Sequence, residues 1–529
     1  MLRRTLRTES ERGIVIATVT SVWTRVRGLL GRMSMYRLVL AALGVLAAAA
    51  LVLSFFELVV PGPLELLATL AVLLVACVGA NALAQLLLRR PIRHESSIIT
   101  AGILLFVLRP TLVPLELVWV GLAGIAAVAS KYLIAWRGRH IFNPAALGAA
   151  VLTISGLGAS AWWVGSPVLA GPVIVLGFLV LARTERLRVV VTFLVVAVGV
   201  SVLRLGVQSQ AAGISFDAGQ ALSFALWSSP FLFLGAFMLS EPLTLPPRRW
   251  QQLTVAVVVG LLAGWPISVG PFTLGQERAL LIGNLLAFVW AAHHAVRLRL
   301  TDARMITPTV RQLTFAARRP VRFAAGQYLE LEVPHRRADA RGTRREFSIV
   351  SAPSDGSNVQ VAYRVTDGPG ESSYKRALAT AETGTDFAAT GVWGDFLLPT
   401  NPGAPVLLVA AGIGVTPFVS QLREARARDL DRDAVVVYVA SAASELAFRD
   451  DLEKAGVKVV VFTRDEPRDL PGNWVWARGV RLDAEGLRRV VPDLASRHAY
   501  ISGPPTLIAE LAPALEKARS LTTDAFAGY

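Results

Sequence analysis

The segment Arg345-Glu346-Phe347-Ser348-Ile349-Val350-Ser351 combines a cation, a flat aromatic ring and a hydroxyl in one short run. Because side chains alternate along a β-strand, Arg345 and Phe347 are expected on one face and Ser348 on the other. A guanidinium suits a pyrophosphate, an aromatic ring suits a planar heterocycle, and a hydroxyl suits its polar edge. The segment therefore predicts a flavin nucleotide site.

Two further motifs flank this segment. Gly326-Gln327-Tyr328 lies upstream, and Gly370-Glu371-Ser372-Ser373-Tyr374 lies downstream, where it is expected to open a helix. The free N–H groups and serine hydroxyls of a helix start can hold a phosphate. Each motif alone also fits an ordinary strand or a serine-capped helix. The three motifs in this order favour the flavin site.

Two glycine turns near the C-terminus predict a second nucleotide site. The run Gly412-Ile413-Gly414-Val415-Thr416-Pro417 follows an apolar stretch, and its Thr-Pro pair is a typical helix start. It departs from the Gly-x-Gly-x-x-Gly fingerprint, because Pro417 stands where the third glycine would be. Ser502-Gly503-Pro504-Pro505 repeats the order of strand, glycine turn and helix start.

The elements that must position these motifs change type near residue 403. Alternating patterns predict strands at 312–316, 328–333, 345–350 and 359–365. Continuous apolar runs at 406–410, 434–439 and 457–462 are typical of parallel strands that are covered on both faces. We expect a flavin-binding β-barrel over 301–402 and an α/β nucleotide-binding domain over 403–529.

In order and spacing, the motifs of residues 305–529 resemble the ferredoxin–NADP reductase superfamily. The resemblance implies an FAD site made by Gln327, Tyr328, Arg345, Phe347, Ser348, Ile349, Gly370, Ser372 and Ser373. It implies a nicotinamide nucleotide site made by Gly412, Gly414, Thr416, Pro417, Gly503 and Pro504. It also assigns catalytic positions to Ser348, Ser502 and Tyr529, since a C-terminal aromatic that covers the flavin is a family trait. Phe526 is the alternative to Tyr529, and a frayed tail is the alternative to both.

Two departures from the family refine these expectations. Ser502 stands where many members carry cysteine, so no sulfur assists hydride transfer. The turn at 440–445 offers no cation and one carboxylate, Glu445, which favours NADH over NADPH. NADPH is the alternative, through Arg449 or Arg464.

The chain before Arg304 has a different composition. Of 529 residues, 53% are hydrophobic and 17% are charged, against about 25% charged in soluble proteins. A membrane span needs about 20 apolar residues. The apolar stretches lie roughly at 36–58, 64–88, 96–108, 113–130, 142–157, 164–182, 189–206, 219–240, 251–269 and 279–296. They predict a polytopic α-helical membrane domain of about ten transmembrane helices over 36–300, after a cytoplasmic segment over 1–35.

Basic residues between the stretches predict the orientation. With the N-terminus inside, only Arg109, Arg204 and Arg278 fall outside. The chain is then expected in a bacterial-type inner membrane as a multi-pass protein with both termini cytoplasmic. This distribution accounts for the net charge of +15 through topology, so no nucleic-acid partner is expected.

An inverted repeat is predicted within the membrane domain. Leu108-Arg109-Pro110 ends the third stretch, Ser240-Glu241-Pro242 ends the eighth, and five spans separate them. The third stretch is short, and Ser228-Ser229-Pro230 interrupts the eighth. Paired short or broken spans in an inverted repeat indicate a binding site near the midplane. The alternative is that proline simply ends a helix at the interface.

The run from His140 to Gly148 carries a second resemblance, together with Ser130-Lys131-Tyr132 and Ser240-Glu241-Pro242. It resembles the membrane subunit that the sodium-translocating NADH:quinone reductase and the Rnf complex have in common. The resemblance implies two inverted five-helix repeats and a second flavin, FMN or riboflavin. The Ser-Gly-Ala-Thr motif for covalent FMN is missing from the sequence, so the expected form is noncovalent.

No metal centre is predicted. One cysteine, Cys77, excludes an internal disulfide and any cysteine-ligated zinc or iron–sulfur site. His94 and His140 fall in expected loops, and His293 and His294 fall near the end of the last span. No histidine pair is expected at mid-membrane, which argues against haem.

The motifs together predict a membrane-bound NAD(P)H-dependent flavin oxidoreductase. It would pass electrons from NADH through FAD into or across the lipid bilayer, to a quinone or to an extracytoplasmic flavin or metal redox partner. The alternative is a transporter or ion-translocating domain gated or energised by the reductase. Candidate pathway residues are Glu57, Glu65, Arg109, Lys131 and Glu241. A third interpretation is a flavin reductase that is merely anchored to the membrane.

Overall fold

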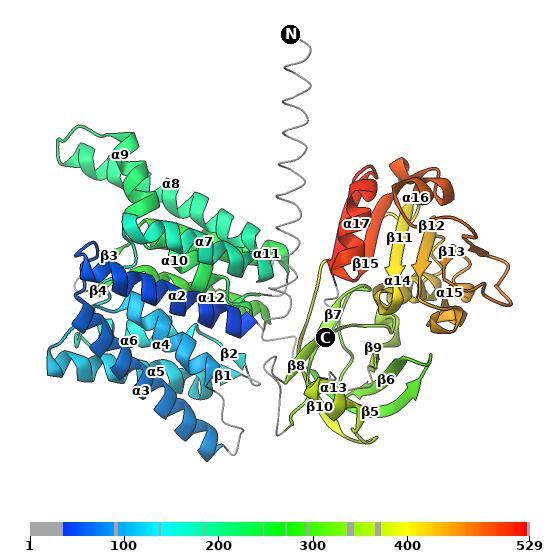
Figure 1. The fold of residues 1–529 in the computed structure, drawn as a ribbon, viewed down its shortest axis with the longest axis horizontal. Helices are drawn as coiled ribbons and strands as arrows, with labels where there is room; N and C mark the ends of the chain where they lie inside the picture. The colour runs from blue at the N-terminus through cyan, green and yellow to red at the C-terminus, as the bar shows by residue number, and fades with distance from the viewer. Residues whose placement is uncertain are drawn as a thin grey trace, which may run out of the picture. The chain divides into compact units, whose positions relative to one another are not determined.

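The computed structural model describes residues 35–88, 94–136, 139–184, 186–246, 248–269, 272–291, 296–335, 343–365 and 372–525. The chain divides into two compact units, Met1–Trp290 and Ala291–Tyr529 (Figure 1). The domain boundary expected at residue 300 falls inside a strand that begins at Val296. Each unit is described by itself.

The first unit is helical, and each predicted apolar stretch contains a helix or a helical run. Its elements are α2 (Met35–Phe55), α3 (Pro63–Leu87), α4 (Glu95–Val107), α5 (Pro114–Leu133), β1 (Ala135–Trp136), β2 (Arg139–His140), α6 (Pro144–Ile154), α7 (Pro167–Thr184), α8 (Leu187–Ala211), α9 (Ala218–Ser223), η1 (Phe224–Ser228), α10 (Phe231–Phe233), η2 (Leu234–Leu239), η3 (Pro242–Thr244), α11 (Arg249–Gly264), β3 (Ser268–Val269), β4 (Phe272–Thr273) and α12 (Gln276–Ala291).

Fewer helices reach membrane-spanning length than the sequence predicted. Within the described residues, α2, α3, α5 and α8 are long and apolar enough to cross a membrane, and a fifth span results if the bent pair 218–228 and 231–239 counts as one. The expectation of about ten transmembrane helices is therefore met only in part. Helix α4 has 13 residues, and most of them are buried inside the unit. Apolar composition does not distinguish such an inner helix from a span.

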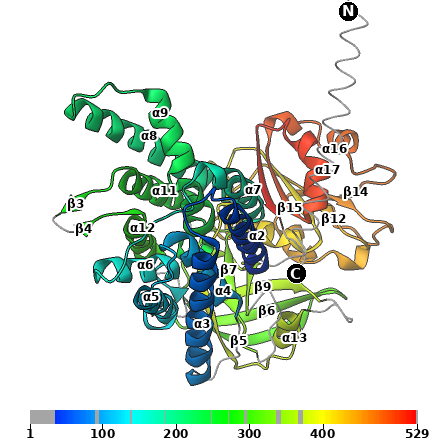
Figure 2. The same ribbon diagram turned by 60° about the vertical axis from the view of Figure 1, so that its left-hand side comes forward.

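The order of elements in this unit occurs twice (Figure 2). In each half, two helices precede a short or broken helix. Another helix, a hairpin of two strands with two residues each, and a last helix follow. The hairpins pair Ala135 with His140 and Ser268 with Thr273. A backbone bond closes each hairpin, from Ile141 N to Ile134 O at 3.2 Å and from Leu274 N to Ile267 O at 2.8 Å. The repeated order agrees with an internal repeat, and the opposite orientation of its copies stays a prediction.

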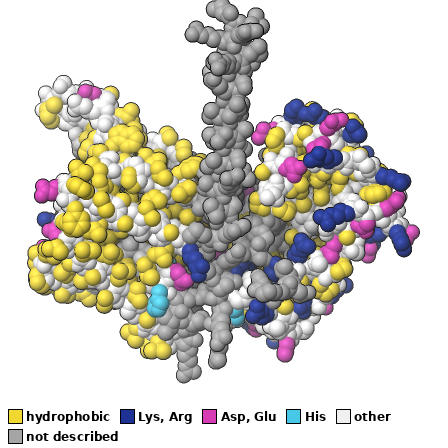
Figure 3. Space-filling model, in the orientation of Figure 1, with side chains coloured by type: hydrophobic (Ala, Val, Ile, Leu, Met, Phe, Trp, Pro, Cys, Tyr) yellow, Lys and Arg dark blue, Asp and Glu magenta, His cyan; other side chains and the backbone are white. Residues whose placement is uncertain are grey.

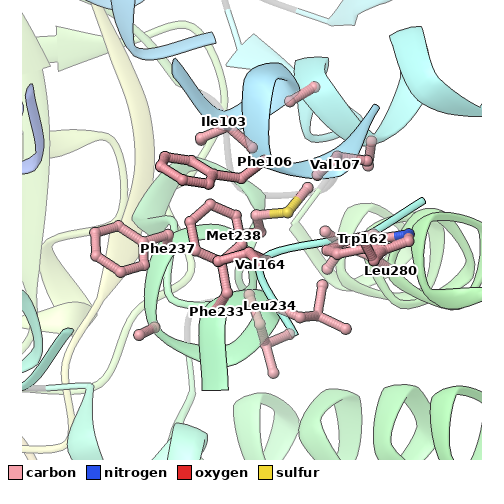
Figure 4. Packing of buried hydrophobic residues seen from close by; sticks show 14 of the residues in the cluster. Ile103, Phe106, Val107, Trp162, Val164, Phe233, Leu234, Phe237, Met238 and Leu280 are labelled. Carbon is pink, nitrogen blue, oxygen red and sulfur yellow. The ribbon is translucent and has the colours of Figure 1, made fainter. Parts of the chain in front are cut away.

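The short helix of one half packs against the broken helix of the other. Phe106 of α4 lies 5.4 Å from Phe233 of α10 and 5.2 Å from Trp163, measured between ring centroids. Phe233 stacks on Phe237 of η2 at 5.1 Å. Figure 4 shows Phe106, Phe233 and Phe237 with Trp162, Met238 and Leu280 in one buried apolar cluster. The centre of the unit is thus closely packed.

The exposed surface of the first unit is apolar. Val60, Val75 and Leu133 are 96%, 76% and 82% exposed. Figure 3 shows hydrophobic side chains over most of its visible face, whereas charged side chains gather on the second unit. An extended apolar surface marks a membrane or protein interface.

The second unit contains two six-stranded sheets joined through one chain. The first sheet is antiparallel and has the order β8-β7-β10-β5-β6-β9. Its strands are β5 (Val296–Met305), β6 (Val310–Ala317), β7 (Tyr328–Glu332), β8 (Arg344–Ser348), β9 (Asn358–Arg364) and β10 (Asp386–Trp393). A bridge from Ile349 to Val361 joins its two edges and closes a barrel. Helix α13 (Ser373–Ala379) follows β9.

The second sheet is parallel, with the order β14-β13-β12-β11-β15-β16. Its strands are β11 (Val406–Ala411), β12 (Ala434–Val439), β13 (Lys458–Phe462), β14 (Trp474–Trp476), β15 (His498–Gly503) and β16 (Ser520–Ala525). The helical elements are η5 (Gly412–Val415), α14 (Thr416–Ala427), η6 (Ala443–Glu445), α15 (Arg449–Lys454), α16 (Ala484–Val490), η7 (Leu494–Ser496) and α17 (Pro505–Leu515). The predicted barrel and α/β architecture of this unit is confirmed.

Candidate functional site

The two glycine turns meet at the edge of the parallel sheet that is formed by the carboxyl ends of its strands. After β11 the chain builds β12, β13 and β14 on one side, and it places β15 on the other side of β11. The strand order therefore reverses between β11 and β15, and parallel sheets bind ligands at the carboxyl ends of strands at such a point. Gly412 follows β11 there, and Gly503 ends β15.

Close backbone approach explains the glycines at this edge. A Cβ on Gly414 would overlap the carbonyl of Ser502, and a Cβ on Gly503 would lie 2.8 Å from Ala411 Cβ. Gly412 has φ +54°, in the left-handed region that favours glycine. The structure thus brings Gly412, Gly414 and Gly503 together, as the sequence predicted. Thr416 and Pro417 begin α14 beside them, and Thr416 donates its hydroxyl hydrogen to Ile413 O at 2.9 Å.

Ser502 holds a polar atom that the surrounding protein does not satisfy. The residue is fully buried, and within the described part of the chain its Oγ has no hydrogen-bond partner. A buried hydroxyl without a partner costs about 1–3 kcal/mol. An unpaired hydroxyl beside a glycine cradle fits a bound nucleotide that supplies the missing partner.

The carboxylate at 445 does not face this edge. Glu445 Oε2 accepts hydrogen bonds from Thr307 at 3.1 Å and from Thr309 at 2.5 Å, both in the turn between β5 and β6. Glu445 therefore ties the nucleotide-binding sheet to the barrel, and the preference for NADH over NADPH indicated by the turn at 440–445 stays a prediction. Asp465 accepts the N–H of Ala443 in this turn. Sequence spacing could not show which partner a loop carboxylate takes.

The flavin motif lies on β8, but its aromatic ring points into the barrel. Arg345 and Phe347 share one face, as predicted, and both are buried. The Phe347 ring packs on Tyr374 at 6.1 Å and on Tyr363 at 6.2 Å. Phe347 is thus a core residue of the barrel, and its part in the flavin site stays a prediction. Alternation defines a shared face and does not say which face is inward.

Tyr328 provides an aromatic ring nearer the surface. It is partly buried on β7, it pairs in register with Ser348, and it stacks on Trp393 at 6.5 Å. Gly394 beside it has φ +112°, and a Cβ there would lie 3.1 Å from the Tyr328 ring. Gly394 and Trp393 belong to this surface and were not predicted, because no motif marks them.

Other predicted flavin residues have structural partners. Gln327 donates from Nε2 to Gly394 O and accepts from Ala324 N through Oε1, so its side chain holds two loops. Ser372 Oγ accepts the N–H of Lys375 and caps α13. Ser373 Oγ lies 3.0 Å from Nε2 of His335, a contact that the sequence did not indicate. Ile349 is fully buried in the barrel core. Gly370 lies outside the described residues.

Burial also determines the ionisation of Tyr374 in the barrel core. Tyr374 is fully buried, and its hydroxyl donates to Leu331 O at 2.9 Å. Burial raises the pKa of Tyr374 well above 10, so it stays neutral at physiological pH. The Arg345 guanidinium lies 5.0 Å from the Tyr374 ring centroid. The two side chains form a fixed base for the barrel end of the site.

The C-terminal aromatics cannot be placed. Tyr529 and Phe526 lie outside the described residues. Strand β16 pairs Asp524 with Ser502 and Ala525 with Gly503. The last described residue therefore lies beside the glycine turn.

Helix α14 fastens the nucleotide-binding sheet to the barrel. Ser420 donates to Ser351 O at 2.7 Å, and Gln421 donates to Phe396 O at 2.7 Å. Arg423 bonds Asp451 twice at 2.7 Å and Gln360 once at 2.7 Å. One helix thus begins at the glycine turn and is held along its length against the barrel.

The first unit contains a separate polar cluster beside a cavity of about 70 Å³. Lys131, Asn143, Glu241 and Phe237 are among the lining residues. Glu241 bonds His140 and Asn143, and Asn284 accepts the backbone N–H of Asn143 at 2.8 Å. The residues singled out in the two halves therefore meet in one place. Glu57, Glu65 and Arg109 are absent from the lining of this cavity.

The described residues contain no group of three histidine, cysteine, aspartate or glutamate side chains that could hold a metal ion. The prediction that the chain needs no metal centre stays a prediction.

Comparison with known proteins gives a family for part of the second unit. Residues 408–512 match the oxidoreductase NAD-binding domain. Ferredoxin–NADP reductase B of Sorangium cellulosum is 32% identical over 157 residues, which is 29% of this chain and 62% of that protein. The reductase component of propane 2-monooxygenase from Mycolicibacterium smegmatis is 23% identical over 219 residues, covering 39% and 60%. The chain spans about three fifths of the length of these relatives.

Among solved structures, a cytochrome P450 reductase of Amycolatopsis matches with a TM-score of 0.38 and 22% identity, over 44% of this chain and 69% of that one. The strand order of the second unit, and not this match, establishes its fold. The likeness of residues 36–300 to the membrane subunit of the two ion-pumping complexes stays a prediction. The second unit is thus similar to ferredoxin–NADP reductase and to reductase components of oxygenases, and residues 408–512 carry the match to an oxidoreductase NAD-binding domain.

Proposed function

We propose that the chain is a membrane-bound oxidoreductase that passes electrons from NADH, through FAD, into or across the membrane. The acceptor is a quinone or an extracytoplasmic flavin or metal redox partner. The observation that carries the proposal is the joining of a reductase-like unit to a unit with an apolar surface and four or five span-length helices. A reductase that acts only in solution needs no unit with an apolar surface and span-length helices.

The residues of the parallel sheet bind and orient the nicotinamide nucleotide. Gly412 and Gly414 let the backbone approach its pyrophosphate, and the N-terminus of α14 at Thr416 attracts the negative charge. Ser502 Oγ, which is buried and unpaired within the described residues, bonds the nicotinamide amide and fixes the ring. Pro504 is the N-cap of α17, which begins at Pro505 directly after the glycine turn.

The barrel residues hold the flavin from the other side. Tyr328 offers its ring, and Ser348, its partner in register, offers a hydroxyl to the polar edge. Arg345 supplies positive charge near the pyrophosphate. FAD, when bound, accepts a hydride and releases electrons one at a time, which links a two-electron donor to a one-electron acceptor. Tyr529 covers the flavin in this proposal.

NADH is the proposed donor, because the turn after β12 offers no cation to a 2′-phosphate. Ser441 is an exposed neutral residue in the turn after β12, and Asp465 places a negative charge beside that turn. A 2′-phosphate would meet no cation in 440–445 and would be repelled by Asp465.

The membrane part of the proposal follows the sequence prediction. Residues 36–300 form the transmembrane domain, 301–402 the flavin domain and 403–529 the nucleotide domain. Both termini lie in the cytoplasm of a bacterial-type cell. The cavity beside Lys131 and Glu241 is the proposed place where a quinone head group is reduced, and a second, noncovalent flavin, FMN or riboflavin, is proposed for this domain as a whole. Monooxygenase reductase components among the relatives favour a redox protein as the other class of acceptor.

A second candidate function is ion transport energised by the reductase. The repeated element order and the 48° break at Ser229-Pro230 support it, because broken helices in repeats are common in transporters.

Activity of the full chain in lipid nanodiscs tests the proposal. NADH oxidation is measured with ferricyanide, which takes electrons from a flavin directly, and with a short-chain quinone. Flavin is extracted with acid and counted. We expect both acceptors to be reduced, with FAD and a second flavin released. Reduction of ferricyanide without quinone, at one flavin per chain, contradicts electron delivery into the membrane and favours the transporter.

A further inference from the structure

The cavity in the first unit is surrounded by polar side chains that come from distant parts of the chain. All are buried or half-buried, and none belongs to the flavin or nucleotide motifs. Ser96, Thr100, Lys131, Asn143 and Glu241 line the cavity, His140 contacts Glu241, and Asn284 contacts Asn143. Buried polar groups in a lipid-facing unit are costly and are retained mainly for function.

Lys131 provides a fixed positive charge at this cavity. Its ammonium donates to Ser96 O at 2.9 Å, to Ser96 Oγ at 2.9 Å and to Thr100 Oγ1 at 2.8 Å. An ammonium has three donors, so these three oxygens use all of them. Lys131 is thus held in place and acts on the cavity through its charge alone.

Glu241 and His140 form an adjacent pair that can exchange a proton. Glu241 Oε1 lies 3.0 Å from His140 Nε2, and Glu241 Oε2 accepts from Asn143 Nδ2 at 2.8 Å. The two side chains are 23% and 12% exposed. Asn143 is itself fixed, because its Oδ1 accepts from Ala146 N and its backbone N–H bonds Asn284. Rigid neighbours hold the carboxylate and the imidazole at hydrogen-bond distance, as proton transfer requires.

The cavity has the size and lining to hold water. About 70 Å³ accommodates several water molecules, each of which needs roughly 10–15 Å³ of probe volume and two to four polar partners. Glu241, Lys131 and Tyr36 are its titratable lining residues among those that the structure describes. Water there can extend the reach of the pair by hydrogen bonds.

We propose that His140 and Glu241 form a proton-transfer site that supplies the proton needed when the membrane acceptor is reduced. This inference rests on the proposed function with a quinone as acceptor. The overall reaction is NADH + H⁺ + quinone → NAD⁺ + quinol. Each of the two protons of the quinol leaves protonated His140 as its N–H bond breaks, passes to Glu241, which lines the cavity, and forms an O–H bond on the reduced quinone directly or through cavity water. A proton from the solvent then returns to His140.

The charge balance of the cluster supports this role. Lys131 and Glu241 carry opposite charges, so the cavity is neutral when His140 is neutral. An electron that arrives alone would place a net negative charge in a low-dielectric site, which is expensive. A proton taken up through His140 restores neutrality.

The chain offers a matched control for a test. Glu277 is also a buried carboxylate of this unit, 3% exposed, and it accepts hydrogen bonds from Ser160 at 3.1 Å and Trp162 at 3.0 Å. It is absent from the cavity lining. The variants Glu241→Gln, His140→Gln and Glu277→Gln therefore separate loss of the pair from loss of a buried charge.

The test uses the full chain in lipid nanodiscs, with decylubiquinone and ferricyanide as alternative acceptors, over pH 5.5 to 9. We expect Glu241→Gln and His140→Gln to lower quinone reduction about 10- to 100-fold. Their pH profile is expected to lose its fall at high pH, and their solvent deuterium isotope effect to rise. Ferricyanide reduction and FAD content stay unchanged, and Glu277→Gln matches the wild type in all readouts.

Three results overturn parts of the reasoning. Quinone reduction and a pH profile unchanged in both pair variants refute the proton-transfer site. Equal losses in Glu241→Gln and Glu277→Gln refute it too, because they show a general effect of a buried carboxylate. A wild-type chain that reduces ferricyanide and no quinone overturns the proposed function itself.

Discussion

Arg423 is predicted to fasten the two halves of the reductase unit together. It lies on α14, and its Nε and Nη2 donate to the two carboxylate oxygens of Asp451 of α15, each at 2.7 Å. Its Nη1 donates to the side-chain oxygen of Gln360 of β9, also at 2.7 Å. The Arg423 and Asp451 side chains are 19% and 22% exposed. Replacing Arg423 with alanine leaves a largely buried carboxylate and a barrel amide without their partner.

The size of the effect follows from these contacts. Hydrogen bonds to charged groups contribute about 1.5–3 kcal/mol, and breaking a buried ion pair costs about 3–5 kcal/mol. Partial exposure places Arg423→Ala near the lower end, at about 3 kcal/mol. Arg428, the residue that follows α14, pairs with Glu424 and is 65% exposed, and the Glu424 carboxylate keeps a hydrogen bond from Ser354 N when Arg428 is removed, so Arg428→Ala should cost about 0–1 kcal/mol.

Urea unfolding of the detergent-purified full chain measures both variants, with the rise in fluorescence on FAD release reporting the reductase unit. Adding Asp451→Ala to each background completes a double-mutant cycle. We expect a coupling of about 1.5–3 kcal/mol between Arg423 and Asp451. An Arg423→Ala cost within 0.5 kcal/mol of the Arg428→Ala cost, with no coupling, refutes the reasoning.

Four further outcomes are expected. Ser502→Ala should raise the KM for NADH several-fold at unchanged FAD content, because the hydroxyl that bonds the nicotinamide is lost; steady-state kinetics with both nucleotides check it, and an unchanged KM contradicts the assignment. Ser441→Arg should raise kcat/KM for NADPH relative to NADH by about tenfold or more, since one charged contact is worth about 1.5–3 kcal/mol; no change in the ratio places the 2′-position elsewhere. Gly414→Ala should destabilise the reductase unit by about 1–3 kcal/mol and abolish nucleotide binding, because its Cβ overlaps the Ser502 carbonyl; normal binding by calorimetry counts against the cradle. The hydrogen bond from Arg497 lowers the pKa of Asp493 below its ordinary 3.8. This pair therefore stabilises the fold above pH 3.8 and loses that contribution as the pH falls through the lowered pKa. The stability difference between wild type and Asp493→Asn should vanish at the acid end of a pH series.

Local patterns were sufficient for the second unit. Apolar runs at 406–410, 434–439 and 457–462 coincide with β11, β12 and β13, because continuous burial on both faces leaves a clear signature in sequence. The glycine turns at 412–414 and 503 were predicted together, since close backbone approach tolerates no side chain. Sequence patterns did not reveal that the Phe347 ring packs inside the barrel or that Glu445 bonds the turn between β5 and β6, because alternation and spacing do not show which side of a strand or loop is inside.

The first unit was harder to predict, for a different reason. Hydropathy located ten apolar stretches, and each coincides with a helix or a helical run. It could not separate the span-length α3 from the 13-residue α4, whose apolar side chains contact protein. Apolar residues are required in both environments, and length decides between them only when helix ends are known.

The sequence by itself determined that the chain combines an apolar helical part with a strand-rich nucleotide-binding part, and which residues flank each glycine turn. These features depend on neighbours within about ten residues, so composition and periodicity suffice to read them. Only the tertiary structure brought Lys131, His140, Asn143 and Glu241 to one cavity and turned Glu445 toward the barrel. Such contacts join positions up to about 140 residues apart, and packing of whole elements, which no local pattern records, decides them.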